Sequence, residues 1–192
     1  MSAAVFLAMI LAGAGAFLTS QHFNKLPDGL EYVTVEGARY AVRSGDEKQD
    51  RAEFLHRVHL RNQRLIDYLK EKHPDDERVK RLIKATPELR QVERASSEAG
   101  YTENKGEAIA LCLSDEDYED KFEALYFVML HELAHVANDA WGHGPEFWVT
   151  FDFIQESAIK AGVYEYEDYS ENSVQICSFS LTQNPCETCA DL

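Results

Sequence analysis

The stretch that decides the fold reads HELAH at residues 131–135 and continues with GHGPEFW at residues 142–148. Residues four apart on a helix share one face, roughly 5–6 Å apart, so the imidazoles of His131 and His135 can reach one metal ion. Glu132 lies about 100° further around the helix, where its carboxylate can reach a water beside the metal without binding the metal itself. The spacing therefore predicts a metal site on a helix.

A third histidine follows this helix. Gly142 and the pair Gly144–Pro145 interrupt helical structure, so the turn between them can direct His143 back toward the first two histidines. The sequence thus supplies three imidazoles and one carboxylate for a single site.

The alternative interpretation is that the histidines belong to a packed core that holds no metal. Apolar residues recur at helical spacing around the motif and indicate a mostly buried helix over about residues 120–140. They are Phe122, Leu125, Tyr126, Met129, Leu130, Leu133 and Val136. Burying unpaired imidazoles is costly, and a shared metal removes that cost, so we favour the metal site.

Together the two motifs resemble those of the SprT and WLM group of zinc metallopeptidases, which includes the Spartan-type DNA–protein crosslink proteases. The resemblance implies that His131, His135 and His143 bind Zn²⁺ and that Glu132 is the catalytic general base. It also favours His143 over Glu146, a rival third ligand on the following helix.

The expected fold is α+β, a zincin-like metallopeptidase domain whose small sheet packs on the HExxH helix, preceded by an N-terminal apolar helix. Residues from about 30 to 181 are also similar to uncharacterised metallopeptidase-type proteins of large DNA viruses, which have no assigned substrate. At 192 residues and 45% apolar content, the chain can bury one substantial core. We expect a hydrophobic segment over residues 1–23, a zinc metallopeptidase-like domain over 24–181 and a tail with a CxxC pair over 182–192.

The predicted activity is zinc-dependent hydrolysis of peptide bonds in a protein or peptide substrate. Three neutral imidazoles leave a zinc position for water, and Glu132 takes the proton of that water and passes it to the leaving amine. A tyrosine hydroxyl can help to stabilise the oxyanion, and the candidates are Tyr101, Tyr164, Tyr166 and Tyr169. The alternative is a non-catalytic scaffold or virion-associated interaction protein that keeps zinc for folding. Glu132 favours the peptidase, because a structural site needs no such carboxylate.

Charge is unevenly distributed along the chain, whose net charge is −15. Residues 43–94 hold 14 of the 19 Lys and Arg beside 11 acids, so the remainder carries 5 bases and 23 acids. Nucleic-acid binding relies on basic patches that displace counterions. The acidic catalytic half therefore makes nucleic acid an unlikely partner, which departs from the Spartan-type proteases.

The chain begins with an uncharged apolar run of 16 residues, 3–18, near the lower limit for a helix that spans a bilayer. We favour a membrane anchor, which predicts a membrane-associated protein at a host or virion membrane. A cleaved signal peptide, which would make the protein secreted, and a buried helix remain alternatives.

Weaker patterns place the other elements. The alternation of apolar and polar residues predicts a β-hairpin over residues 32–42. Apolar residues at helical spacing predict helices over about 47–72, 75–84 and 144–161. Residues 96–100 are interpreted as a loop. Residues 107–113 and 174–181 are interpreted as strands, the first of which could be the edge on which an extended substrate lies.

Four cysteines remain. Cys112 and Cys177 fall in predicted strands and are interpreted as buried thiols. Cys186 and Cys189 have the spacing of half a zinc site, whose other half would come from the first two cysteines or from another chain. A redox pair or a terminal disulfide is equally open in an oxidising compartment. We favour an ordinary flexible tail.

Overall fold

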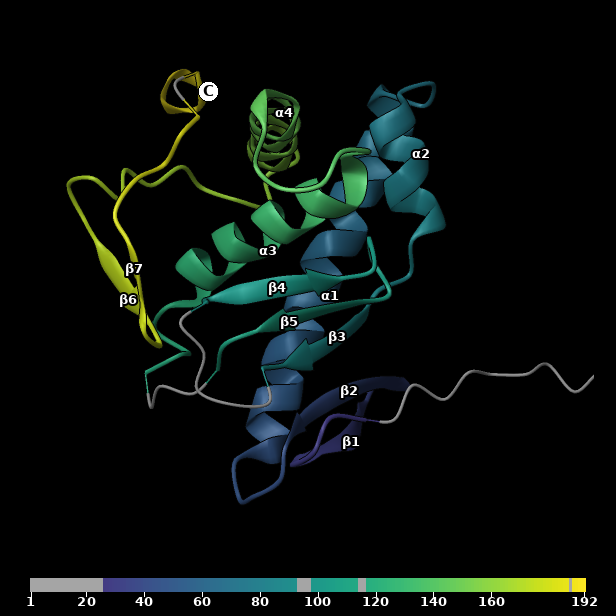
Figure 1. The fold of residues 1–192 in the computed structure, drawn as a ribbon, viewed down its shortest axis with the longest axis vertical. Coiled ribbons are helices and arrows are strands. Elements are labelled where there is room, and N and C mark those ends of the chain that lie inside the picture. Colours follow the sequence, from purple (N-terminus) through teal and green to yellow (C-terminus); the bar gives the residue numbers. More distant parts are fainter. Residues whose placement is uncertain (1–25, 93–97, 114–116, 187) are drawn as a thin grey trace, which may run out of the picture.

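A five-stranded mixed sheet and four α-helices make up most of the computed structural model, which describes residues 26–92, 98–113, 117–186 and 188–192 (Figure 1). The sheet contains β1 (Leu30–Val35), β2 (Ala38–Arg43), β3 (Glu88–Gln91), β4 (Gly100–Glu103) and β5 (Ala108–Leu111). The helices are α1 (Lys48–Lys72), α2 (Glu77–Lys84), α3 (Phe122–Ala137) and α4 (Pro145–Lys160). A hairpin of β6 (Val174–Ile176) and β7 (Phe179–Leu181) and a 3-10 helix (Cys189–Asp191) follow. This mixture of helices and sheet is compatible with the expected α+β class.

The sheet has the strand order β1-β2-β3-β5-β4. The predicted hairpin is confirmed as β1 and β2, which pair antiparallel around Glu36 and Gly37, both with positive φ. β2, β3 and β5 run parallel, and β4 pairs antiparallel with β5. The prediction that the strand within residues 107–113 forms the edge is wrong, because β4 covers its outer side. β4 had no sequence signal, since Gly-Tyr-Thr-Glu shows no apolar alternation.

α1 and α3 meet beside the sheet and share its hydrophobic core. α1 buries an apolar face that includes Phe54, whose ring lies 4.9 Å from that of Phe122 at the start of α3. The Arg61 guanidinium binds the carboxylate of Glu123 and stacks 4.4 Å from the Phe122 ring centroid. The charged face that the sequence predicted for α1 thus includes a polar link to α3.

β4 lies unusually close to α3 because Gly100 has no side chain. A Cβ atom at this position would lie 2.8 Å from Val128 Cγ1 and 2.9 Å from the Ala110 carbonyl oxygen, both shorter than any normal contact. The glycine therefore allows β4 to run directly beside α3, the helix that contains residues 131–135. This close approach buries Glu132 between the two elements.

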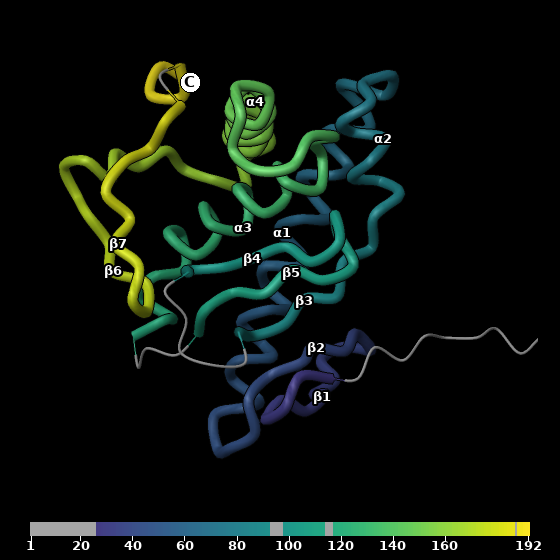
Figure 2. The backbone as a smooth tube through the Cα atoms, viewed as in Figure 1, coloured from purple at the N-terminus to yellow at the C-terminus, as the bar shows by residue number. Residues whose placement is uncertain are grey.

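The β6–β7 hairpin is attached to the sheet by a disulfide between Cys112, which follows β5, and Cys177 in the hairpin turn. The interpretation of these two cysteines as buried thiols is therefore wrong. They are 65 residues apart in sequence and meet only in the folded chain. The backbone trace in Figure 2 shows that this bond places the hairpin beside the start of β4 and α3, far from the β1–β2 hairpin.

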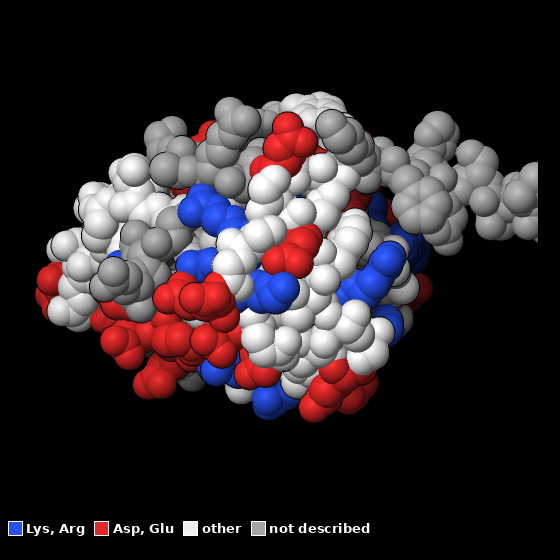
Figure 3. All heavy atoms as spheres, turned by 90° about the horizontal axis from the view of Figure 1, so that it is seen from below, with Lys and Arg blue, Asp and Glu red and all other residues white. Residues whose placement is uncertain are grey.

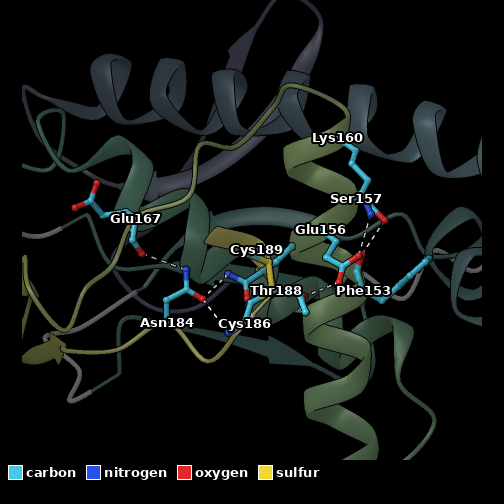
Figure 4. Close-up of a disulfide and its surroundings, with 10 residues drawn as sticks. Phe153, Glu156, Ser157, Lys160, Glu167, Asn184, Cys186, Thr188 and Cys189 are labelled. Atoms are coloured by element: carbon cyan, nitrogen blue, oxygen red, sulfur yellow. Dashed lines mark hydrogen bonds and ion pairs between the residues drawn. A yellow bond between two sulfur atoms is a disulfide. The ribbon is translucent and has the colours of Figure 1, made fainter. Parts of the chain in front are cut away.

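The C-terminal tail is docked on α4, which corrects the expectation of a flexible tail. Cys186 and Cys189 form a disulfide and are both 1% exposed. Thr188 Oγ1 donates a 2.8 Å hydrogen bond to a Glu156 carboxylate oxygen on α4, and Asn184 Nδ2 donates to the Glu167 carbonyl (Figure 4). Of the alternatives left open by the sequence, the terminal disulfide is the one that the structure contains.

The two disulfides should differ in their contributions to stability. Replacing Cys112 and Cys177 by alanine should lower the free energy of unfolding by about 4 kcal/mol, because that bond closes a long loop and restricts the unfolded chain. Replacing Cys186 and Cys189 by alanine also removes two sulfurs but opens only a short loop. This change should lower the free energy of unfolding by about 2 kcal/mol. Urea unfolding of both variants measures the difference, and a larger loss from the terminal pair would contradict this explanation.

The expected membrane-associated localisation is contradicted. Within the part of the chain that the structure describes, no helix is both long and apolar enough to cross a bilayer, which takes about 20 mostly apolar residues. α1 has 25 residues but carries charges along its length, and α3 has only 16. The segment over residues 1–23 that suggested an anchor, with its expected apolar helix, lies outside the described residues.

Candidate metal centre

The three predicted histidines converge on one point. His131 and His135 lie one turn apart on α3, and His143 reaches them from the loop between α3 and α4. His143 Nε2 lies 2.9 Å from His131 Nε2 and 3.1 Å from His135 Nε2. One nitrogen from each ring lies within 4.8 Å of the other two, an arrangement that could hold a metal ion.

The α3–α4 loop and the first turn of α4 orient His143. Gly142 has φ +76°, a left-handed conformation that reverses the chain, and Pro145 begins α4 directly after Gly144. In the first turn of α4, the ring of Phe147 packs at 4.4–4.8 Å from all three imidazole rings and is fully buried. This phenylalanine therefore fixes the relative positions of the three rings.

Two of the imidazoles are held neutral. Burial, with a further contribution from the neighbouring imidazoles, lowers the pKa of His131 to about 3 and that of His135 to about 4. A neutral imidazole keeps the nitrogen lone pair that a metal requires. A tetrahedral zinc ion with bonds of about 2.0–2.1 Å sets its ligand atoms about 3.3 Å apart, within a few tenths of an ångström of the distances to His143. The donor set therefore fits zinc.

Glu132 is 5% exposed and is held by a residue that the sequence did not reveal. Thr102 on β4 donates a 2.8 Å hydrogen bond from Oγ1 to Glu132 Oε2. Burial raises the pKa of the Glu132 carboxyl to about 7, although the bond from Thr102 acts in the opposite direction. This bond fixes the orientation of the Glu132 carboxylate.

Lys105 is a second residue that the sequence analysis missed. It lies in the β4–β5 turn, where residues 104–106 all have positive φ. Its Nζ lies 3.3, 3.0 and 2.5 Å from the carbonyl oxygens of His135, Asn138 and Ala140, at the end of α3 and in the loop that leads to His143. The last carbonyls of a helix have no partner within it, so this ammonium stabilises both the helix end and the path of the loop.

Removing the charge of Lys105 should weaken metal binding without removing a ligand. Outer residues that orient metal ligands typically contribute about 10- to 100-fold in affinity, so Lys105→Met should raise the Kd for zinc within that range. Lys80→Met is the matched control, because Lys80 is an exposed lysine on α2 that pairs with Glu77. Competition with a chromophoric zinc chelator measures both values. Equal affinities would show that the loop holds its shape without Lys105.

The remaining sequence candidates lie in different surroundings. Among the described residues, the cluster that could hold a metal ion consists of the three histidines, and Glu146 is exposed on the first turn of α4. Of the four candidate tyrosines, only Tyr101 lines the cleft at the histidines, and its hydroxyl lies 3.5 Å from a guanidinium nitrogen of Arg90. Tyr164 and Tyr169 are buried with their hydroxyls 3.4 Å apart.

A cleft of about 580 Å³ opens at the histidines and Glu132. Thr102 and Lys105 line it on the side of β4, and Trp141 and His143 line it on the side of the α3–α4 loop. A different face of the molecule is drawn in Figure 3, where lysines and arginines are interspersed with neutral residues and acidic side chains gather toward one side. The described residues on that face form no continuous basic band.

Comparison with known proteins gives one family and one viral relative. Residues 38–184 match the family described as the WLM domain. An uncharacterized protein of Acanthamoeba polyphaga mimivirus is 28% identical over 161 residues, which cover 78% of this chain and 80% of the viral protein. No solved structure matches the chain.

Proposed function

This chain belongs to the WLM domain family, and we propose that it is a zinc-dependent endopeptidase with His131, His135 and His143 as metal ligands and Glu132 as general base. One observation carries the proposal. Three imidazole nitrogens converge beside the buried carboxylate of Glu132, which lies on the same helix as His131 and His135. A structural zinc site needs only its ligands, whereas hydrolysis also needs a group that accepts and returns a proton.

Zinc held by three imidazoles supplies a Lewis acid that lowers the pKa of water to about 7 and polarises the scissile carbonyl. The Glu132 carboxylate accepts the proton of the attacking water and then delivers it to the nitrogen of the leaving amine. The hydrogen bond from Thr102 holds this carboxylate in one orientation throughout. Phe147 excludes water from the inner side of the three rings.

The edge strand β4 suggests how a polypeptide is held. β4 pairs with β5 on one side, no strand among the described residues pairs with its other side, and Thr102 on β4 lines the cleft. A peptide that adds to a sheet edge is bound through its backbone, without dependence on its sequence. We infer that an extended segment of substrate lies along β4, with the scissile bond beside the histidines. The sequence predicted this role of substrate-binding edge for the strand within residues 107–113, which is β5. We assign this role to β4 instead.

The charge of the chain favours an enzyme that acts on a protein or peptide without the help of nucleic acid. Apart from residues 43–94, the chain carries 5 bases and 23 acids, and the face in Figure 3 has its bases interspersed. Binding that displaces counterions from a phosphate backbone needs clustered Lys and Arg. We therefore propose that neither DNA nor RNA stimulates the activity.

The test is removal and return of the metal. The full chain is incubated with an unfolded, casein-like protein as purified, after treatment with a zinc chelator and after dialysis into equimolar zinc. Cleavage should be present, lost and restored in that order, and added DNA should not change the rate. Zinc binding without cleavage of any unfolded protein would contradict the peptidase and support the non-catalytic scaffold or virion-associated interaction protein.

A further inference from the structure

The cleft continues well beyond the histidines, and its far section is apolar. Its lining residues extend from the histidines along α3 and β4 to the β6–β7 hairpin. The lining of this section consists of Ala99, Phe127, Val128, Phe179 and Leu181. Sites that bind small molecules are typically lined by apolar and aromatic side chains in this way.

The β6–β7 hairpin supplies one wall of this section through Phe179 and Leu181. Leu181 is 5% exposed and contributes to the core, whereas Phe179 is 40% exposed. A single exposed aromatic side chain on a surface is common and needs no explanation. Phe179 differs because it lines a concave site with other apolar groups, on a hairpin that the Cys112–Cys177 disulfide ties to the end of β5.

The distance from the histidines matches the spacing of a peptide. Phe127 and Val128 lie one helical turn before His131 on α3, which corresponds to about 5.4 Å along the axis. An extended peptide advances about 3.3 Å per residue, so this turn corresponds to one or two residues of substrate. A peptide on the edge of β4 with its scissile bond at the histidines therefore places a nearby side chain in the apolar section.

We propose that this section selects a large apolar side chain, of the size of leucine, methionine or phenylalanine, one or two residues from the scissile bond, and that Phe179 determines this specificity. The inference rests on the proposed peptidase function and adds the class of substrate to it.

The test uses peptides that carry Phe, Leu, Ala or Asp at one position and are otherwise identical, with the two positions on each side of the scissile bond varied in turn. At one of these positions the zinc-loaded full chain should prefer Phe or Leu over Ala by about 10- to 200-fold in kcat/KM, the range typical of apolar pockets. Phe179→Ala should reduce that preference about tenfold.

Binding gives a second readout that does not depend on turnover. Both tryptophans of the chain, Trp141 and Trp148, line the cleft, so their fluorescence should report on peptide binding in the Glu132→Gln variant. The Kd values should follow the same order as the kcat/KM values, and Phe179→Ala should reduce the differences among them about tenfold. Val149→Ala is the matched control, because Val149 is an exposed apolar residue on α4 outside the cleft lining.

The outcomes separate the two proposals. Hydrolysis that ignores side-chain size at all four positions, or a preference that Phe179→Ala leaves unchanged, overturns the specificity and leaves the peptidase intact. Failure to hydrolyse any peptide or unfolded protein overturns the peptidase, and the specificity falls with it. A preference that Phe179→Ala weakens and Val149→Ala does not would establish the hairpin as part of the substrate site.

Discussion

Replacing Glu132 with glutamine is expected to lower kcat/KM for hydrolysis by about 10²- to 10⁴-fold, the usual contribution of a positioned proton-transfer group. Glutamine has nearly the same shape, and its amide oxygen can still accept the hydrogen bond from Thr102, so the fold and the three histidines should not change. The amide cannot accept a proton from water, however. Zinc content per chain should therefore equal that of the wild type while turnover is lost.

Glu146→Gln is the matched control for this experiment. Glu146 is the rival metal ligand suggested by the sequence, and it is exposed at the start of α4. The same chemical change at this position should leave both zinc content and kcat/KM within about twofold of the wild type, as expected for a surface substitution. Full activity of Glu132→Gln would refute the general-base role, and loss of zinc in Glu146→Gln would instead make Glu146 a ligand.

The sequence was sufficient to find the triad because short-range geometry determines it. The spacing of His131 and His135 fixes their shared face as soon as a helix forms, and Gly142 marks the turn that brings His143 back. The helices were found for the same reason, since each carries its own apolar periodicity. A sequence pattern predicts an element when the residues that define the pattern are neighbours within one helical turn or one strand.

The residues that support the triad could not be found in this way, because their contacts join distant parts of the chain. Thr102 and Lys105 each reach α3 or its end from about thirty residues earlier in the sequence. Their role depends on β4 lying beside α3, which in turn depends on a missing Cβ at Gly100. The motif Asn104–Lys105–Gly106 does indicate a turn, but nothing local indicates which carbonyls the lysine will meet.

The cysteines illustrate the same limit. Cys112 and Cys177 were predicted to lie within strands, but Cys112 follows β5 and Cys177 lies in the turn between β6 and β7. This turn was missed because Cys177 has a positive φ, which is rare for a non-glycine residue. That turn makes the segment a hairpin instead of one strand. It also brings Cys177 to Cys112, a pairing that only the folded chain defines.

Replacing His143 with alanine is expected to weaken zinc binding by more than about 100-fold, because even the loss of a residue that only orients a ligand costs about 10- to 100-fold. His143 is an exposed loop residue, so the metal-free variant should fold and unfold like the metal-free wild type. The wild type and the variant should differ in stability only when zinc is present. At a zinc concentration 100 times the wild-type Kd, binding stabilises the wild type by about 2.7 kcal/mol but a variant with a 100-fold higher Kd by only about 0.4 kcal/mol.

For a chain of this size the difference corresponds to a zinc-dependent rise in Tm of roughly 5–10 °C in the wild type and 1–2 °C in the His143→Ala variant. His73→Ala is the matched control, since His73 is an exposed histidine at the end of α1 and should leave the rise unchanged. A zinc-dependent rise that survives His143→Ala would remove this histidine from the ligand set. Because Glu132 needs a three-ligand metal beside it to act as proposed, the same result would also remove the structural basis of the hydrolytic mechanism.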